Sequence, residues 1–326
     1  MRTVTIPTHG GPEVMRIADT PKPAPGPDDI LVRVRAAGIN RADAIQRQGQ
    51  YPMPPGVGNI LGLELSGEVD SVGANVDEWK PGDRVMGLVA EGAYAEYARM
   101  DRGLAVPMPA GWSFADGGAV IEVFLTAQET VFGLGQLKRR ETLLVHAGGS
   151  GVGSAAIQMA KHHGSTVYFT AGDIGKVERL LALGADAGWN YKTHDFVEMA
   201  FNESKGKGVD VIEDFIGAGA FMRNLSLLKV QGRLVMVGNM GGNIDTFQMN
   251  AMMRKRLRIL GFTLRAQSVN EKRAIIKRFR ERWLPALESG AIKPIVHATF
   301  PLERVSEAHA MLERNENFGK IVLTID

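Results

Sequence analysis

The chain has 326 residues, 44% of them hydrophobic and 23% charged, with a formal net charge of +2 at pH 7. This length allows two domains with separate cores, while so weak a net charge gives no reason to expect nucleic-acid binding. The absence of cysteine excludes disulfides, thiolate metal sites and a cysteine nucleophile.

The first third of the chain reads as short strands separated by glycine and proline. Residues 28–39 alternate apolar and polar side chains, which is the period of a half-buried strand. Residues 61–73 and 82–88 read as further strands, and the proline-rich segment 20–29 predicts a loop. We therefore expect an antiparallel, barrel-like β region.

From about residue 124 strands alternate with helices, which predicts an α/β domain with a parallel, doubly wound sheet. The expected strands are 142–148, 166–172, 209–216, 233–238 and 257–262. The expected helices are 151–163, 174–184 and 220–232. This domain is expected to span residues 124–261.

The remaining residues, 262–326, are expected to return to the first domain, 1–123. Residues 270–290 predict one basic amphipathic helix, most simply a solvated face on a helix packed against the core. Residues 318–326 read as a final strand. No stretch has the pattern of a signal peptide or of a membrane span, so we expect a soluble, cytoplasmic protein.

The sequence Gly148-Gly149-Ser150-Gly151 lies between a predicted strand and a predicted helix. Glycines allow a tight turn, and the free N–H groups at the start of the helix favour an anion. This context is the one required for a dinucleotide fingerprint, G-x-G-x-x-G. Serine stands at the middle position, where its hydroxyl is able to donate to a phosphate, and the last glycine is Gly153.

The end of the second predicted strand bears on which dinucleotide binds. An NAD site usually has an acidic residue there to hold the ribose 2′-OH. Ala171 and Gly172 stand at that point, and Lys176 follows one turn into the next helix, where it offers a positive charge to a 2′-phosphate. Asp173 opposes this preference because its charge disfavours a phosphate. The sequence thus favours NADPH.

Four stretches in order resemble the medium-chain dehydrogenase/reductase superfamily: residues 38–56, 60–69, 145–161 and 317–323. Within it they resemble the zinc-free quinone oxidoreductases, and most closely the tumour-suppressor-inducible type, which shares the stretch NRADxxQRQGQY. The resemblance covers essentially the whole chain. It implies a GroES-like catalytic domain (1–123 and 262–326), a Rossmann domain (124–261), NADPH, a quinone-like acceptor and a homodimer joined through the Rossmann sheets.

The resemblance also implies the cofactor contacts. They are expected at Thr126, Gly148, Ser150, Gly151, Val152, Gly172, Lys176, Tyr191, Gly238, Asn239, Met240, Leu264, Arg265 and Asn317. The chain departs from many relatives at three positions. Many have Ser or Thr in place of Asp173 and Pro in place of Ile121, and some have Tyr in place of Ile45.

The zinc ligands of the superfamily's alcohol dehydrogenases are missing. Asn40 stands at the position of the first ligand, and Leu63 replaces the histidine beside Glu64. Since zinc needs at least three Cys, His or carboxylate ligands, we expect no metal.

Tyr51 and Asn40 are the residues expected to serve the reaction. The Tyr51 ring is able to stack on a planar acceptor and its hydroxyl to bind a carbonyl oxygen, in the cleft between the domains. Asn40 is a possible donor into the same pocket. Three functions stay open: an NADPH:quinone oxidoreductase, an NADPH-dependent enoyl or enone reductase, and a zeta-crystallin-like protein that binds NADPH and RNA.

Overall fold

The computed structural model describes residues 1–51, 60–244, 246–247 and 249–326. The chain divides into two units, of which the first comprises Met1–Val123 with Arg265–Asp326 and the second Phe124–Leu264. They are called the β-rich unit and the parallel-sheet unit below. None of the described helices is long and apolar enough to cross a membrane.

The β-rich unit is built on a seven-stranded sheet in the order β14-β15-β3-β4-β5-β7, with β6 paired to β3. All pairings are antiparallel except that of β14 with β15, which refines the antiparallel, barrel-like region expected from the sequence. The strands are β3 (Asp29–Gly38), β4 (Glu64–Val72), β5 (Arg84–Leu88), β6 (Tyr97–Asp101), β7 (Ala105–Pro107), β14 (Val296–Pro301) and β15 (Lys320–Thr324). A separate two-stranded sheet pairs β1 (Arg2–Thr5) with β2 (Arg16–Asp19).

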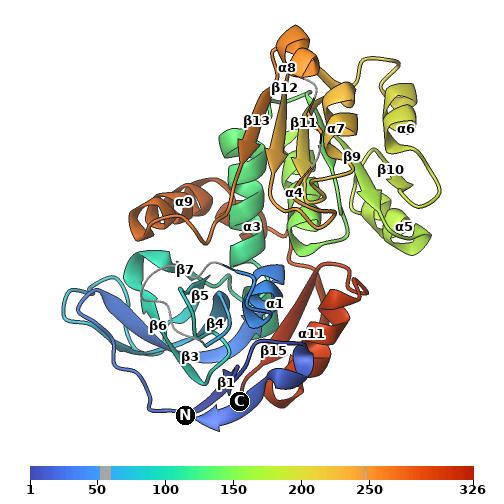
Figure 1. The fold of residues 1–326 in the computed structure, drawn as a ribbon. Helices are drawn as coiled ribbons and strands as arrows, with labels where there is room; N and C mark the ends of the chain where they lie inside the picture. The colour runs from blue at the N-terminus through green and yellow to red at the C-terminus, as the bar shows by residue number, and fades with distance from the viewer. Residues whose placement is uncertain (52–59, 245, 248) are drawn as a thin grey trace. The chain divides into compact units, whose positions relative to one another are not determined.

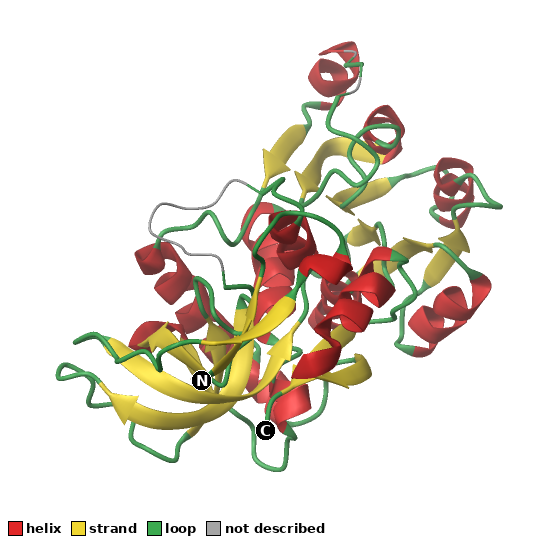
Figure 2. Cartoon of the chain, turned by 60° about the horizontal axis from the view of Figure 1, so that its bottom comes forward, coloured by secondary structure: helices red, strands yellow, loops and turns green. Residues whose placement is uncertain are grey.

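Both ends of the chain contribute to this unit, as Figure 2 shows from the position of the two termini beside its strands. The last strand, β15, pairs with β3 so that Val322 lies opposite Gly38. The helical segments of the unit are η1 (Pro12–Val14), α1 (Arg41–Arg47), η2 (Arg102–Leu104), α2 (Phe114–Gly117), α9 (Val269–Arg282), α10 (Leu284–Glu288), η4 (Leu302–Arg304) and α11 (Val305–Glu313).

The prediction of a single helix over residues 270–290 is wrong. The segment forms two helices, α9 and α10, which are separated at Trp283. Pro285 is the physical reason: its ring lacks an N–H and disfavours helical backbone in the residue before it. The new helix therefore restarts with Pro285 in its first turn.

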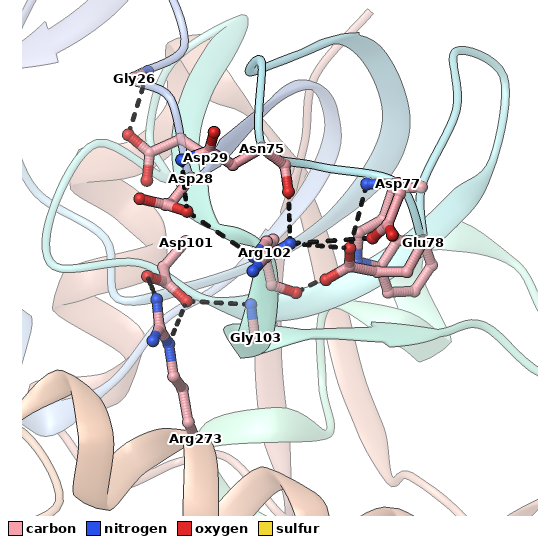
Figure 3. Close-up of polar contacts among 11 residues, drawn as sticks. Gly26, Asp28, Asp29, Asn75, Asp77, Glu78, Asp101, Arg102, Gly103 and Arg273 are labelled. Atoms are coloured by element: carbon pink, nitrogen blue, oxygen red, sulfur yellow. Dashed lines mark hydrogen bonds and ion pairs between the residues drawn. The ribbon is translucent and has the colours of Figure 1, made fainter.

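The basic face of α9 is partly engaged within the β-rich unit. Arg273 donates from Nη2 and Nε to the Asp101 carboxylate at 2.6 and 2.9 Å. Asp101 also accepts from the Gly103 N–H at 2.9 Å, and Arg102 lies among further acidic groups beside it (Figure 3). This ion pair attaches α9 to the last residue of β6, so at least part of the basic run serves the fold.

The parallel-sheet unit holds six strands, all parallel, in the order β10-β9-β8-β11-β12-β13 (Figure 1). The strands are β8 (Thr142–Val145), β9 (Thr166–Ala171), β10 (Ala187–Asn190), β11 (Val209–Asp214), β12 (Leu228–Met236) and β13 (Arg258–Gly261). The helices are α4 (Gly151–His163), α5 (Ile174–Ala182), α6 (Phe196–Glu203), α7 (Phe221–Leu227) and α8 (Met249–Lys255). Helix α3 (Ile121–Ala127) starts in the β-rich unit and continues into this one from Phe124, and the π-helix Gln128–Leu134 follows it. The predicted doubly wound parallel sheet is confirmed.

The core of this unit explains its strands. All four residues of β8 are buried, and Leu144, Ile212 and Leu234 from three neighbouring strands join one apolar cluster with Trp189 and Phe196. Strands covered by helices on both faces carry such continuous apolar runs, because neither face meets water.

The helix predicted over residues 220–232 is also wrong in its second half. Helix α7 ends at Leu227, and β12 begins at Leu228, which pairs with Val209. Gln231 then adopts φ 63°, which a continuing helix does not allow. The pairing with β11 thus outweighs the local helical pattern.

Candidate active site

The strand order of the parallel-sheet unit reverses between β8 and β11, which are neighbours in the sheet although β9 and β10 separate them in the chain. In open parallel sheets, ligands bind outside the carboxyl ends of the strands at such a switch point. The loop after β8, residues 146–150, lies at this place. The predicted dinucleotide loop therefore stands where the topology favours a ligand.

Ser150 is the N-cap of α4, and its Oγ accepts from the Gly153 N–H at 3.0 Å. A hydroxyl that accepts one hydrogen bond keeps its own proton available for donation. The serine at the middle of the fingerprint is thus compatible with the predicted hydrogen bond to a phosphate. The cap also leaves the first N–H groups of α4, from Gly151 and Val152, at the start of the helix dipole.

The outer glycines of the fingerprint let the helix approach the strand. A Cβ at Gly153 would lie 2.6 Å from the Ala147 carbonyl oxygen, and one at Gly148 would lie 3.0 Å from Leu180. Neither position accepts a side chain without a shift of its surroundings. The close packing that the fingerprint requires of these glycines is therefore present.

The end of β9 brings several predicted residues together. Asp173 caps α5 by accepting from the Lys176 N–H at 2.8 Å, and the Lys176 Nζ lies 4.0 Å from the Asp173 carboxylate. The hydroxyl of Tyr191 lies 3.0 Å from the position that a Cβ on Gly172 would take, so a larger residue there would displace the tyrosine hydroxyl. The end of β9 thus brings Lys176 and the Tyr191 hydroxyl close to Ala171, a position that has no acidic side chain.

The remaining predicted cofactor contacts lie in several places. Gly238, Asn239 and Met240 follow β12 at the carboxyl end of the sheet, where the Met240 N–H donates to the Phe215 carbonyl at 3.1 Å. Buried in the same unit are Thr126, on α3, and Leu264, its last residue. Arg265 and Asn317 belong to the β-rich unit, where the Asn317 side chain donates to the Gly319 carbonyl at 2.7 Å.

In the β-rich unit, Asn40 belongs to a buried polar network with Glu64 and Lys320. Asn40 Nδ2 donates to Glu64 Oε1 at 3.0 Å and to the Gly38 carbonyl at 3.3 Å. The Lys320 ammonium lies 2.7 Å from both Asn40 Oδ1 and Glu64 Oε1. Both donors of the amide are directed to protein acceptors, so the Asn40 side chain orients this ion pair.

A second buried chain of polar groups extends from Asn40. Asp43 accepts from the Asn40 backbone N–H at 2.8 Å and from the Tyr94 hydroxyl at 2.9 Å, and Tyr94 is 3.3 Å from His309. Burial raises the pKa of Asp43 to about 6, and burial together with the Arg47 charge lowers the pKa of His309 to about 3. His309 is consequently neutral at physiological pH.

Tyr51 lies beside Arg265, whose guanidinium carbon is 5.0 Å from the centre of the tyrosine ring. Burial raises the pKa of Tyr51, and the Arg265 charge opposes the shift. The phenol is therefore protonated at neutral pH and able to donate. Residues 52–59, which continue the predicted stretch of residues 38–56, fall outside the described part of the chain.

Sequence reasoning missed Glu122, at the start of α3. Its backbone N–H donates to Glu64 Oε2 at 2.9 Å. Burial and then the Glu64 charge raise the pKa of the Glu122 carboxyl to about 8, although the residue keeps partial access to solvent. The sequence signal for Glu122 was an acidic residue within the apolar run of residues 118–127. Lys320, a charged residue within the final predicted strand, was a similar signal for its own buried site.

Among the described residues, no group of three or more His, Asp or Glu side chains is placed to hold a metal ion. The position of the first zinc ligand is occupied by Asn40, and Glu64 is neutralised by the Lys320 ammonium.

Two protein families match the chain: "Alcohol dehydrogenase GroES-like domain" over residues 26–110 and "Zinc-binding dehydrogenase" over residues 151–281. Among curated proteins, the quinone oxidoreductase of Rattus norvegicus is 30% identical over 328 residues, which cover 100% of this chain and 98% of the relative.

Three solved structures share the fold over nearly the whole chain. The Escherichia coli quinone oxidoreductase complexed with NADPH superposes with a TM-score of 0.91 at 30% identity, covering 99% of this chain and 100% of the other. An NAD-dependent alcohol dehydrogenase has a TM-score of 0.89 at 33% identity, with 100% of both chains covered. The CurK enoyl reductase has a TM-score of 0.89 at 25% identity, with 100% and 99% covered. The predicted combination of a GroES-like and a Rossmann domain is confirmed.

Proposed function

Because the chain belongs to the medium-chain dehydrogenase/reductase superfamily and has quinone oxidoreductase homologues over its full length, we propose that it is an NADPH:quinone oxidoreductase. The observation that carries the quinone assignment is the similarity to the rat enzyme, which covers the whole chain. The coarser statement, that the protein is an oxidoreductase of this superfamily, follows from the same finding.

The residues of the parallel-sheet unit fit NADPH. The start of α4 with Ser150 suits the diphosphate, and the end of β9 offers Lys176 and Tyr191 to the 2′-phosphate side of the ribose. Asp173 weakens this preference through its charge 4.0 Å from Lys176. When bound, NADPH supplies the hydride, so the protein has to bind and orient both reactants and exclude water.

The residues of the β-rich unit suit a conjugated carbonyl acceptor. The Tyr51 hydroxyl is protonated and able to hydrogen-bond a carbonyl oxygen, and its ring offers stacking area. A quinone needs little polarisation because it becomes aromatic on reduction. Its oxygens are able to take protons from water, so the reaction requires no positioned acid.

An enoyl or enone reductase is the second candidate, favoured by the likeness to the CurK enoyl reductase and by Glu122. Hydride addition to a C=C bond leaves a carbon atom that must receive a proton from a placed donor. Tyr51 and the Glu122 carboxyl, which is protonated at neutral pH, are two such donors in one unit.

The two candidates are separated by kinetics of Tyr51→Phe and Tyr51→Ala with a quinone and with an enone. On a quinone, Phe should lose only about 0.5–1.5 kcal/mol of hydrogen bonding, and Ala should lose more because the ring goes too. If Tyr51 protonates an enone, Phe should be nearly as damaging as Ala, since general acid catalysis is worth about 10²–10⁴-fold. Unchanged rates and affinities in both variants would remove Tyr51 from the site.

We also propose a cytoplasmic homodimer. Strand β13 is one of the two edges of the parallel sheet, and no strand in the described part of the chain pairs with its outer side, so it is able to pair with a second copy. Sedimentation measures the oligomeric state of the wild-type chain and of Ile259→Pro, a substitution within β13, and so tests the assembly. A monomeric wild type contradicts it, and cell fractionation tests the compartment.

A further inference from the structure

The resemblance implies that Arg265 contacts the cofactor, but the environment of its side chain points to a second role. Arg265 is only 7% exposed. Within the described part of the chain, Nε and both Nη atoms of its guanidinium are buried without a hydrogen-bond acceptor. Buried polar groups are nearly always hydrogen-bonded, and a buried charge without a partner is strongly destabilising. A group that completes this environment is therefore expected.

None of the nearby carboxyl groups in the described part of the chain accepts a hydrogen bond from the Arg265 guanidinium, although the Arg265 charge acts on Asp43 through space. Asp43 is hydrogen-bonded by the Asn40 N–H and the Tyr94 hydroxyl, and Glu64 is paired with Lys320. The Glu122 carboxyl is uncharged at neutral pH, because burial raises its pKa to about 8. Among the described residues, these three acids therefore leave the guanidinium without a hydrogen-bonded carboxylate.

Two neighbours hold the arginine in place. The Tyr51 ring lies 5.0 Å from its guanidinium carbon, a cation–π distance. Lys272 of α9 donates from Nζ to the Arg265 carbonyl oxygen at 3.0 Å, which fixes the backbone and adds a second positive charge. The result is an oriented guanidinium with a second positive charge nearby, beside a tyrosine already proposed to contact the acceptor.

We propose that Arg265 binds an anionic group, a carboxylate, carried by the conjugated carbonyl compound that the protein reduces. The planar fork of a guanidinium matches a carboxylate with two parallel hydrogen bonds, and Tyr51 then contacts the adjoining ring. This inference rests on the proposed function for the identity of the acceptor, and it narrows the substrate class to acidic acceptors.

The first test is equilibrium binding, which needs no turnover. Calorimetry compares benzoate with benzamide, with and without NADP⁺, on the wild type, Arg265→Met and Arg265→Lys. Wild type should prefer benzoate, Met should lose about 10- to 150-fold in benzoate affinity, and Lys should retain part of it. Arg273→Met is the matched control, because Arg273 has its own partner in Asp101 and should leave benzoate affinity unchanged.

The second test is kinetic and uses a naphthoquinone carboxylate against its methyl ester. Arg265→Met should raise KM for the carboxylate by about 10- to 150-fold, as expected for benzoate affinity, and leave KM for the ester unchanged. If Arg265→Met loses as much affinity for NADPH as for the carboxylate, Arg265 binds the cofactor and the proposal is overturned. Equal effects on acid and ester would overturn it too, as would a wild type that binds benzamide as well as benzoate.

Failure of the two ideas is distinguishable. If no quinone or enone is reduced but benzoate binding depends on Arg265, the proposed reaction fails and the anion site stands. If quinones are reduced without any preference for the acid, the reaction stands and the anion site fails.

Discussion

The loop after β8 and the region around Glu64 differ in how they satisfy their polar groups. In the loop, the Gly153 N–H donates to Ser150 Oγ three positions earlier, and Gly148 and Gly153 allow the close packing of the backbone. Around Glu64, the partners are Asn40, Glu122 and Lys320, which come from three distant segments. One region is built by local sequence and the other by tertiary folding.

The electrostatic consequences differ as well. A helix start with capped N–H groups presents partial charges that an anion complements, and no full charge has to be buried. Around Glu64 full charges are taken out of water, so each depends on its partner. Removal of a polar side chain should therefore cost little stability in the first region, where only the glycines are sterically constrained, and much more in the second.

The largest expected effect is that of Lys320→Met. Among the described residues, it leaves the Asn40 amide and the Glu122 N–H as hydrogen-bond donors to the fully buried Glu64 carboxylate. Removing one partner of a buried ion pair costs about 3–5 kcal/mol of unfolding free energy. Urea unfolding followed by circular dichroism measures the loss.

Lys161→Met is the matched control in the other unit. Its ammonium lies 2.7 Å from Asp186, the same distance as in the buried pair, but both side chains are partly exposed. An exposed pair is worth about 0–1 kcal/mol. Similar losses in the two variants would contradict the distinction between the regions.

The second effect concerns cofactor choice at the end of β9. Lys176→Ala should weaken NADPH binding by about 1.5–3 kcal/mol, or about 10- to 150-fold, and leave NADH binding nearly unchanged. Asp173→Ser keeps an N-cap oxygen for α5 and removes the charge 4.0 Å from Lys176, so it should strengthen NADPH binding. Fluorescence titration of both cofactors measures this, and tighter binding of NADH than NADPH by the wild type refutes the interpretation of the strand end.

The contrast between the regions explains what the sequence predicts. The loop of residues 148–153, its strand and its helix are local, so spacing and residue type identify them. The link between Glu122 and Glu64 joins residues 58 positions apart, and that between Lys320 and Asn40 joins residues 280 apart, so no local pattern predicts either. For the same reason, the pairing of Leu228 with Val209 overrode a locally helical pattern.

A third effect concerns pH, and it compares one buried acid in each unit. Burial raises the pKa of Glu122 in the β-rich unit and of Glu213 in the parallel-sheet unit to about 8. Between the ordinary pKa, near 4.5, and 8 the folded state keeps a proton that the unfolded state has lost. Unfolding free energy therefore falls as pH rises through this window.

Between pH 6.5 and 8 each acid should lower the unfolding free energy by about 2 kcal/mol, at about 1.4 kcal/mol per pH unit. Asp43, with a pKa of about 6, adds only a small decline at the lower end of this range, while His309, which is neutral in the folded state and has an ordinary pKa near 6.5 in the unfolded state, offsets about 0.4 kcal/mol of it. Glu122→Gln and Glu213→Gln should each flatten the decline, because glutamine cannot ionise. A wild-type stability that rises over this range refutes the prediction.

The smallest effect separates two roles of Ser150. Ser150→Ala removes the cap of α4 and should lower the unfolding free energy by about 1 kcal/mol. Ser268 caps α9 in the β-rich unit in the same way, so Ser268→Ala should cost a similar amount. Only the loss at Ser150 should extend to NADPH affinity, because its hydroxyl proton is the one proposed to reach the phosphate.

Ser150→Asp separates stability from cofactor binding more clearly. Its carboxylate keeps an acceptor for the Gly153 N–H, so stability should be retained, while its charge repels the diphosphate. Cofactor titration beside thermal unfolding of the three variants decides the matter, and a Ser150→Asp variant that binds NADPH as tightly as the wild type would place the diphosphate elsewhere.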